Sequence, residues 1–434
     1  MSSKDEEEGD SQEFTLNGKL SGWHHKTKAP KLLRFTLLGY RDDGTGDLRL
    51  PSSGKWLNAM TPYVDEYVII KAKGYMNETG DKVVARELIE IKKMTEGEMQ
   101  EYHDNAKSAA TREHVSPPAA LSFSGTWGPR MSIPSAMHPD EVDAFNVSQF
   151  SKQFSQLTTA SYVMVNVTQP AHGQFFTAPH ADLAEALKLD PPAFPTRDVL
   201  GETLDAIASS GKKALVYVAA EGFHTGGTVE DRAAWDKYIG AEGLSHNDAT
   251  AKLIIGHYAK TYGSKIHGWW FDGSTGLNIK DRKLWKRVVR DGNPEAIVAF
   301  NRMAGPPFRC TTECDYFGGH PTPRSVHNFW DEVNLPMIEA VEAGPWMGNK
   351  GEPEEDKAIG ALGHVFMGMQ KRWNFGGLEF PPEQAVEWTS RVVKAGGMYT
   401  WHVPRNKSVM VGKQFGLLLK IDAAIAELRK GEEL

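Results

Sequence analysis

The chain has few cysteines and no long apolar run, and each absence excludes a class of protein. Cys310 and Cys314 are the only two cysteines among 434 residues, which excludes a disulfide framework. Their spacing matches no standard zinc motif and no second pair of ligands follows, so we expect no metal and no other cofactor. No stretch contains eighteen consecutive apolar residues, so we expect no membrane-spanning helix.

An excess of positive charge is also missing. The 49 Lys and Arg against 56 Asp and Glu give a formal net charge of −7, which argues against nucleic acid as a partner. The start MSSKDEEEGD has neither the basic segment nor the apolar core of a signal peptide. Read as it stands, this start predicts a cytoplasmic protein, whereas a truncated N-terminus would allow secretion. The oligomeric state is left open.

The first part of the chain has the composition of a tail followed by a small β-domain. Residues 1–13 are acidic and polar, and we expect them to be disordered. Residues 14–95 contain β-branched and aromatic runs separated by turn sequences such as RDDGTGD. They predict a small all-β domain, which could be OB-like and serve for docking or for binding. Residues 96–118 are polar and are expected to form a linker.

Residues 119–434 alternate apolar strands with helical segments, which is typical of βα units and a parallel sheet. Four strand runs are clear before residue 305: SYVMVNVTQ (161–169), ALVYVAAEG (214–222), KIHGWWFDG (265–273) and AIVAFNRM (296–303). Further units follow, including MYTWHVP (398–404). The predicted fold class is therefore α/β, with a (β/α)8 TIM-like barrel after the small β-domain.

Polar residues gather at the predicted carboxyl ends of these strands, where barrels of this type carry their active sites. Asp272 follows three bulky aromatic residues at one such end. A carboxylate at the rim of an aromatic cavity suits carbohydrate chemistry, because aromatic faces stack on sugar rings and a carboxylate can attack an oxocarbenium-like centre. The structural alternative is that Asp272 caps the next helix or forms a salt bridge.

The order of these elements resembles the catalytic barrel of the α-L-fucosidases, glycoside hydrolase family 29, and the related fucoidan hydrolases of the same clan. GWWFDG is similar to the strand end that supplies the family's nucleophile, so the resemblance implies that role for Asp272. SGTWGP (124–129), the 158–176 segment, AIVAFNRM and VVKAGGMYTWHVP (392–404) resemble other family segments in the same order. The resemblance covers about three quarters of the chain, and only the W-F-D-G motif is specific.

The chain departs from the fucosidase pattern at several positions. Thr126 stands in place of a histidine, the paired histidines of the second strand are reduced to His172, and Arg324 stands where a Glu often follows Thr-Pro. We also expect no C-terminal β-sandwich, since the sequence ends soon after the helical stretch GLLLKIDAAIAELRKGEEL. In the related fucoidan hydrolases a histidine is the general acid/base, so the resemblance favours His320 for that role, with Glu313 as the second candidate.

These residues predict a retaining glycoside hydrolase that acts on α-L-fucosyl or related, including sulfated, sugars. The alternative is a non-catalytic carbohydrate-binding relative of the barrel. Either protein has a carbohydrate as its partner, and neither reading fixes the sugar, its linkage or endo against exo action. The candidate substrate-binding residues are His172, Trp127, Gln169, Trp270, Arg302 and Trp346.

Overall fold

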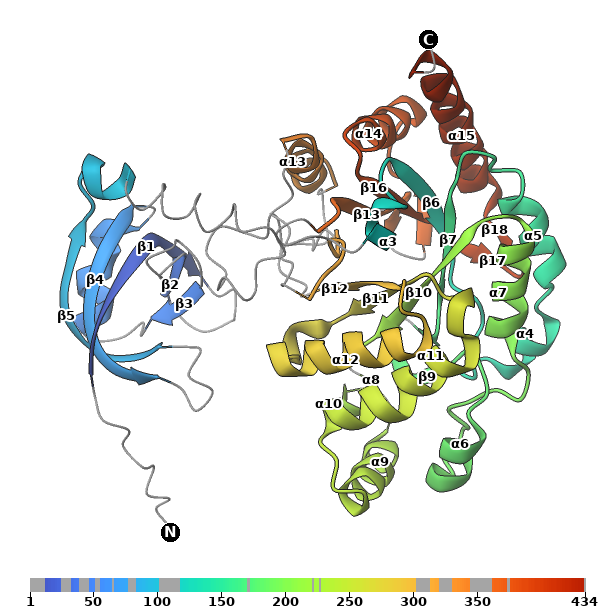
Figure 1. The fold of residues 1–434 in the computed structure, drawn as a ribbon, viewed down its shortest axis with the longest axis horizontal. Coiled ribbons are helices and arrows are strands. Elements are labelled where there is room, and N and C mark those ends of the chain that lie inside the picture. The colour runs from blue at the N-terminus through green and yellow to red at the C-terminus, as the bar shows by residue number, and fades with distance from the viewer. Residues whose placement is uncertain are drawn as a thin grey trace. The chain divides into compact units, whose positions relative to one another are not determined.

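The structure is a computed structural model that divides the chain into two compact units (Figure 1). The smaller, here the β-unit, comprises Met1–His114 and Gly348–Ile359, and the larger, here the barrel unit, comprises Val115–Met347 and Gly360–Leu434. The structure describes residues 12–24, 33–38, 47–50, 55–64, 66–76, 83–100, 118–169, 172–220, 222–225, 228–301, 313–319, 330–343, 361–372 and 375–432.

The β-unit contains one five-stranded antiparallel sheet in the order β3-β2-β1-β4-β5. Its strands are β1 (Gln12–His24), β2 (Leu33–Leu38), β3 (Asp47–Leu50), β4 (Tyr67–Met76) and β5 (Val83–Lys93), with the short helices α1 (Lys55–Met60) and η1 (Thr61–Tyr63) between β3 and β4. The first half of β1 pairs with β4 and its second half with β2. Alternate residues such as Leu16, Val68 and Ile70 form its apolar core. The predicted small all-β domain is thus confirmed, with the strand number of an OB-fold.

The barrel unit is built on a parallel sheet in the order β12-β11-β10-β7-β6-β16-β13. In chain order the strands are β6 (Thr126–Arg130), β7 (Tyr162–Asn166), β10 (Lys213–Ala219), β11 (Gly268–Asp272), β12 (Ile297–Phe300), β13 (His364–Gly368) and β16 (Met398–His402). Each is fully or almost fully buried because helices cover one face and the barrel interior the other. Three small hairpin pairs lie beside it: β8 (Thr168–Gln169) with β9 (His172–Phe176), β14 (Gln370–Arg372) with β15 (Phe375–Leu378), and β17 (Arg405–Asn406) with β18 (Val409–Met410).

An eighth, less regular position closes this sheet between its two edges. Asp315 N donates to Val298 O of β12 at 2.7 Å, and Leu362 N, just before β13, donates to Asp315 O at 2.9 Å. Phe317 N in turn donates to Leu362 O at 2.9 Å. Residues 314–318 therefore join β12 to β13 as the sixth strand in chain order. The predicted (β/α)8 barrel is confirmed.

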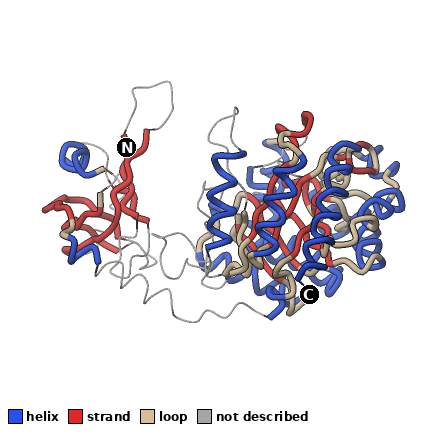
Figure 2. The backbone as a smooth tube through the Cα atoms, turned by 90° about the horizontal axis from the view of Figure 1, so that it is seen from above, coloured by secondary structure: helices blue, strands red, loops and turns tan. Residues whose placement is uncertain are grey.

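Helices surround the barrel strands, which Figures 1 and 2 show at the centre of this unit. They are α3 (Pro118–Leu121), α4 (Pro139–Ala144), α5 (Val147–Phe154), α6 (Ala181–Leu187), α7 (Val199–Ser209), α8 (Gly222–Thr225), α9 (Val229–Ala241), α10 (His246–Ala249), η2 (Thr250–Ile255), α11 (Gly256–Tyr262), η3 (Gly263–Lys265), η4 (Ser274–Gly276), α12 (Ile279–Gly292), α13 (Trp330–Ala343), α14 (Pro382–Lys394) and α15 (Gly412–Glu432). Within the part of the chain described above, no helix is both long and apolar enough to cross a membrane.

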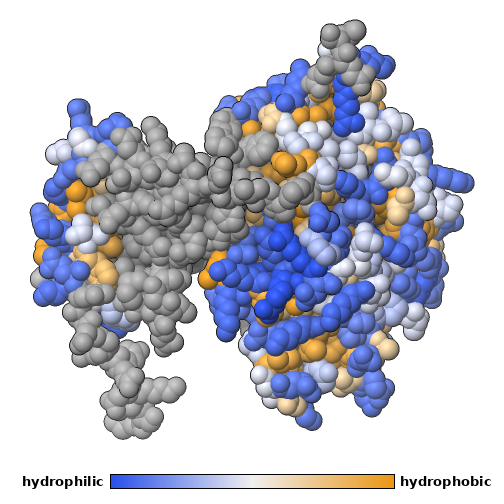
Figure 3. All heavy atoms as spheres, viewed as in Figure 1, coloured by the Kyte–Doolittle hydropathy of each residue, from blue (hydrophilic) through white to orange (hydrophobic). Residues whose placement is uncertain are grey.

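Helix α12 illustrates why these segments form the outer layer. Trp285 and Val289 are buried against the strands, whereas Lys280, Lys283 and Arg287 are exposed, which is the spacing of an amphipathic helix. Its outer face is strongly hydrophilic (Figure 3). Asn278 begins the helix with a capping box, since its side chain accepts from Asp281 N while the Asp281 side chain accepts from Asn278 N.

The alternation of side chains along β11 explains the aromatic run before Asp272. Trp270 belongs to the buried cluster that fills the barrel, with Tyr162, Tyr217 and Phe366. Phe271 packs on the other side against Trp285 of α12, with ring centroids 5.0 Å apart. Because successive side chains alternate between faces, Asp272 lies on the same interior side as Trp270.

Candidate active site

Asp272 is held by three hydrogen-bond donors at the carboxyl end of β11. Its Oδ2 accepts from the Tyr217 hydroxyl at 2.7 Å. Its Oδ1 accepts from Asn301 Nδ2 at 2.7 Å and from Gly273 N at 3.0 Å. Gly273 has φ 65°, a left-handed conformation that glycine adopts without strain. The carboxylate is therefore fixed in orientation by groups from β10, β11 and the end of β12.

In each of these contacts a carboxylate oxygen accepts, so both oxygens of Asp272 are engaged. The side chain is only partly buried, so the carboxylate remains reachable. It forms no ion pair among the described residues. Neither expected structural role, a helix cap or a salt bridge, accounts for this arrangement. A carboxylate fixed in orientation at a barrel mouth can act as a nucleophile.

Aromatic rings form a floor below Asp272. Tyr217 stacks on Trp270 with ring centroids 5.3 Å apart, and Trp270 meets Phe366 edge to face at 4.9 Å. Trp270 is fully buried and its Nε1 donates to Gly318 O at 2.8 Å. Trp270, predicted to bind substrate, therefore supports Tyr217 from below, and no part of its ring is exposed to a ligand.

Arg130, at the end of β6, lies over the Tyr217 ring of this floor. Its guanidinium carbon is 4.6 Å from the Tyr217 ring centroid, a cation–π contact. Nη1 lies 2.9 Å from His402 Nδ1. Since an arginine only donates, Nδ1 of His402 accepts and the ring proton is on Nε2. Burial lowers the pKa of Arg130 to about 10, against the opposing attraction of Tyr217 and Asp272, so the side chain is charged at neutral pH.

Two predicted substrate-binding residues lie in the β8–β9 hairpin that follows β7. Gln169 and His172 are register partners in this pair. Gln169 is partly buried and its Oε1 accepts from Ser135 Oγ at 3.3 Å. For His172 the structure describes the backbone only. The hairpin extends the second barrel strand at its carboxyl end, where both residues were expected.

Three further candidates, Arg302, His320 and Trp346, lie outside the described residues. Their neighbours in the chain still bear on the prediction. Arg302 follows Asn301, which contacts Asp272 directly. His320 follows Gly319, whose carbonyl accepts from Phe366 N at the carboxyl end of the sixth strand.

Trp127 is not in the position predicted for it. Its ring is fully buried, and its Nε1 donates to Thr159 Oγ1 at 2.9 Å. Thr159 is in turn bonded to Asp422 of α15. Trp127 and Arg130 are three residues apart on one strand, so their side chains lie on opposite faces. Trp127 therefore anchors the outer helix layer, and the prediction that it binds substrate is wrong.

Glu313 is also displaced from its predicted role as acid/base. Asp315 N donates to Val298 O, which in a parallel pair places Asp315 level with Ala299 and therefore with Trp270. Counting along the strands, Glu313 lies four residue levels before Asp272, or about 13 Å at the usual rise per residue. Glu313 thus precedes the sixth strand, away from the carboxyl end that presents Asp272, and this position favours His320 over Glu313 as the predicted acid/base.

The neighbours of Glu313 have structural roles. Asp315 is buried and forms ion pairs with Lys286 at 2.9 Å and Arg290 at 3.1 Å. Cys314 is disulfide-bonded, so it carries no free thiol for a metal. Among the residues whose placement is described, no group of three His, Cys, Asp or Glu could hold a metal ion.

Sequence reasoning missed Tyr217, Asn301's direct contact, Arg130 and His402. Tyr217 is the one aromatic residue in the strand run ALVYVAAEG, and Arg130 ends the run that begins at Thr126. The available signal for Arg130 was a charged residue at the end of a strand, two positions after a glycine, Gly128. A Cβ at Gly128 would lie 2.7 Å from the Tyr162 ring, which marks that face of β6 as the crowded interior.

Comparison with known proteins agrees with this fold. The profile of the endo-α(1,4)-fucoidanase Mef1 family matches residues 117–309, less than half of the chain. The endo-fucoidan hydrolase P5AFcnA, of glycoside hydrolase family 107, superposes with a TM-score of 0.60 at 21% identity, over 71% of this chain and 93% of that chain. The chain has the fold of these fucoidan hydrolases.

Two other solved structures extend the comparison. The endo-fucoidan hydrolase MfFcnA9 gives a TM-score of 0.62 at 19% identity, over 73% of this chain but only 65% of that longer chain. An α-L-fucosidase from Lactobacillus casei gives 0.47 at 14% identity, over 72% of this chain and 100% of that chain. A search of curated protein sequences found no significant match. The resemblance seen in the sequence motifs is confirmed, and it is a divergent one.

Proposed function

We propose that the chain is a retaining glycoside hydrolase that cleaves α-L-fucosyl linkages in a fucan-type polysaccharide. The observation that carries the proposal is the Asp272 carboxylate, fixed by three donors above an aromatic floor at the carboxyl end of a (β/α)8 barrel. Support comes from the shared fold and from the matching family, whose description names an endo-α(1,4)-fucoidanase.

In the first step Asp272 attacks the anomeric carbon while the bond from that carbon to the leaving oxygen breaks. We assign His320 as the acid that protonates this oxygen. In the second step water attacks the glycosyl–enzyme ester, His320 takes its proton, and the Asp272 carboxylate is released. Tyr217, Asn301 and Gly273 N hold the carboxylate oxygens in place during both steps.

The sugar ring would lie above the Tyr217 floor. Gln169, His172, Arg302 and Trp346 are the proposed contacts with its hydroxyls and faces. Trp127 and Glu313 are left out of the proposal because of their positions, and Trp270 is proposed to act through Tyr217.

The test is hydrolysis of fucans and of aryl α-L-fucosides and α-L-galactosides by the wild type and by Asp272→Ala. We expect fucan cleavage that falls by at least about 10³-fold in the variant. Product sizes over time separate internal cleavage from release of single sugars. The matched control is Asp205→Ala, because Asp205 is an exposed aspartate paired with Lys265. Equal activity of wild type and Asp272→Ala, or sugar binding without turnover by the wild type, would contradict the proposal.

A further inference from the structure

Arg130 carries a positive charge into the aromatic interior of the barrel without a carboxylate beside it. The side chain is 3% exposed, and it is charged at neutral pH although burial lowers its pKa to about 10. Within the part of the chain that the structure describes, no Asp or Glu forms a salt bridge with it. A buried charge is costly unless other groups compensate it, so its contacts indicate its role.

Aromatic faces and one histidine compensate this charge. The guanidinium carbon lies 4.6 Å from the ring centroid of Tyr217 and 5.9 Å from that of Phe366. Nη1 donates to His402 Nδ1 at 2.9 Å. Nε and Nη2 have no oxygen or nitrogen partner, and the neighbouring rings offer them π-faces instead. The guanidinium therefore crosses the barrel interior from β6 and contacts side chains of β10, β13 and β16.

Tyr217 is held by two groups that come from opposite sides of its strand. In the sheet, β10 lies between β11 and β7, and β6 follows β7. Trp270 of β11 stacks on the Tyr217 ring with centroids 5.3 Å apart, and Arg130 reaches the ring from the β6 side. The Tyr217 hydroxyl donates to Asp272 Oδ2 at 2.7 Å. Arg130 and Trp270 together thus fix the position of this hydroxyl.

The charge of Arg130 also bears on the hydrogen bond between Tyr217 and Asp272. A cation over a phenol ring draws electron density from it, which makes the hydroxyl a stronger donor. Burial lowers the pKa of the guanidinium, and the attraction of Tyr217 and Asp272 opposes this effect, so the two sites interact. Asp272 becomes neutral when it forms the ester and is released as a carboxylate in the second step. A stronger donor at Oδ2 stabilises the carboxylate as it leaves.

We propose that Arg130 is a positioning residue that acts on Asp272 through Tyr217. Arg130 touches neither the sugar nor the reacting atoms. It fixes the Tyr217 ring and strengthens the hydrogen bond from the Tyr217 hydroxyl to Oδ2, while His402 holds the guanidinium by accepting from Nη1. The inference rests on the proposed function, because it gives Arg130 a part in the reaction at Asp272.

A double-mutant cycle separates this role from a general contribution to the fold. Arg130→Met removes the charge, and kcat on fucan should fall by about 5- to 30-fold, the loss expected for a desolvated cation–π contact. KM should stay within about twofold, because Arg130 is buried and does not touch the sugar. In a Tyr217→Phe background, Arg130→Met should lower kcat by no more than about twofold, since the hydroxyl through which it acts is gone.

Two further variants complete the cycle. Arg130→Lys keeps the charge and should recover part of the lost activity, and it carries the same cycle if Arg130→Met does not fold. Arg391→Gln is the matched control, because Arg391 is an arginine on the outer layer that pairs with Glu342. This control should leave kcat and KM unchanged in both backgrounds.

A spectroscopic measurement keeps the test independent of turnover. The tyrosines are labelled with carbon-13 at the ring carbon that bears the hydroxyl, and the NMR signal that disappears in Tyr217→Phe identifies Tyr217. This signal should move in Arg130→Met, in the same direction as in Asp272→Ala, which removes the acceptor. It should move less in Arg130→Lys and stay in place in Arg391→Gln.

The outcomes distinguish the two proposals. If the signal moves as expected but the wild type hydrolyses no fucan, the proposed function is overturned and the positioning role stands. Three results in an active enzyme would overturn the positioning role: an equal fall in kcat on Arg130→Met in both backgrounds, a KM several times higher with kcat unchanged, or a Tyr217 signal that does not move.

Discussion

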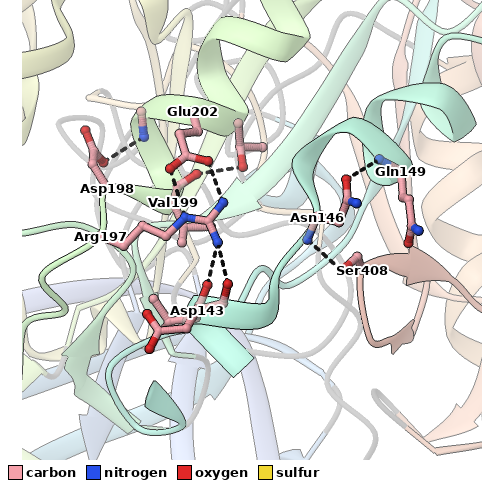
Figure 4. A network of polar contacts seen from close by, with 11 residues as sticks. Asp143, Asn146, Gln149, Arg197, Asp198, Val199, Glu202 and Ser408 are labelled. Carbon is pink, nitrogen blue, oxygen red and sulfur yellow. Dashed lines mark hydrogen bonds and ion pairs between the residues drawn. The ribbon is translucent and has the colours of Figure 1, made fainter. Parts of the chain in front are cut away.

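Two arginines of the barrel unit differ in how many of their guanidinium nitrogen atoms have a hydrogen-bond partner. Arg197, just before α7, donates from Nε and Nη2 to the Glu202 carboxylate at 2.9 and 2.6 Å, and from Nη1 to the carbonyls of Val142 and Asp143 (Figure 4). Arg130 has one hydrogen bond, to His402, and two unpaired nitrogen atoms.

The same contrast holds for the surroundings of the two arginines. Around Arg197 the helix starts are capped: Asp198 accepts from Gly201 N at 2.8 Å, and Asn146 accepts from Gln149 N at 3.0 Å. Near Arg130, Asn166 keeps an unpaired amide. Arg197 and the caps around it use their polar groups within the chain, whereas Arg130 and Asn166 keep buried nitrogen atoms without a partner near the Asp272 site. Substitutions in the first region should change stability, and those in the second should change activity.

The largest effect on stability is expected on acidification, through His364. Its Nδ1 donates to Phe317 O and its Nε2 accepts from Thr400 Oγ1, both at 2.8 Å. Burial lowers the pKa of His364 from 6.5 to about 4. The folded state binds this proton less readily than the unfolded chain, so stability is complete above pH 6.5 and falls as the pH drops toward 4. The loss from this residue should reach about 3 kcal/mol.

Urea denaturation between pH 7 and pH 4 measures this loss, and His364→Gln should flatten the curve. Some slope should remain in the variant, because burial also lowers the pKa of His180 and of His257. If the variant kept the pH dependence of the wild type, His364 would not be the buried histidine that lowers stability at acid pH.

Tyr217→Phe should lower activity and leave stability almost unchanged. It removes the donor to Asp272 Oδ2 while keeping the ring that stacks on Trp270. A hydrogen bond to a charged group is worth about 1.5–3 kcal/mol, so kcat/KM on fucan should fall by about 10- to 100-fold. The melting temperature should change by no more than a few degrees. A large loss of stability with unchanged kcat/KM would place Tyr217 among the structural groups.

Arg197→Met tests the satisfied region directly. The Arg197–Glu202 pair is partly exposed, so its loss together with two bonds to carbonyls should lower the free energy of unfolding by about 2 kcal/mol. Chemical denaturation gives this value, and kcat/KM should match the wild type. Reduced activity in a variant of normal stability would contradict a purely structural role for Arg197.

The smallest effect is expected for Trp127→Phe. Loss of the bond to Thr159 and a smaller ring should lower the free energy of unfolding by about 1–2 kcal/mol. Because the ring lies outside the barrel interior, KM should stay within about twofold of the wild type. A KM several times higher, with normal folding, would restore Trp127 as a substrate contact.

Sequence patterns were sufficient for the parts of the fold that depend on local periodicity. The alternating strands and helices predicted the barrel, and the run ending in Asp272 predicted a strand that presents an acid at its carboxyl end. Patterns could not decide which face of β6 lies inside, so Trp127 was a candidate and Arg130 was missed. They also gave no register for the sixth strand, which is why Glu313 was a candidate. Both errors concern pairing between distant segments, which only the folded structure supplies.

The most direct test of the account is to trap the sugar on Asp272. A 2-deoxy-2-fluoro fucosyl or fuco-oligosaccharyl fluoride should form a slowly hydrolysed ester with the nucleophile. Tryptic digestion and mass spectrometry should then find the added sugar on the peptide of residues 266–280, at Asp272. Label on a different carboxylate, or fucan hydrolysis with inversion at the anomeric carbon and no label, would contradict Asp272 as the nucleophile.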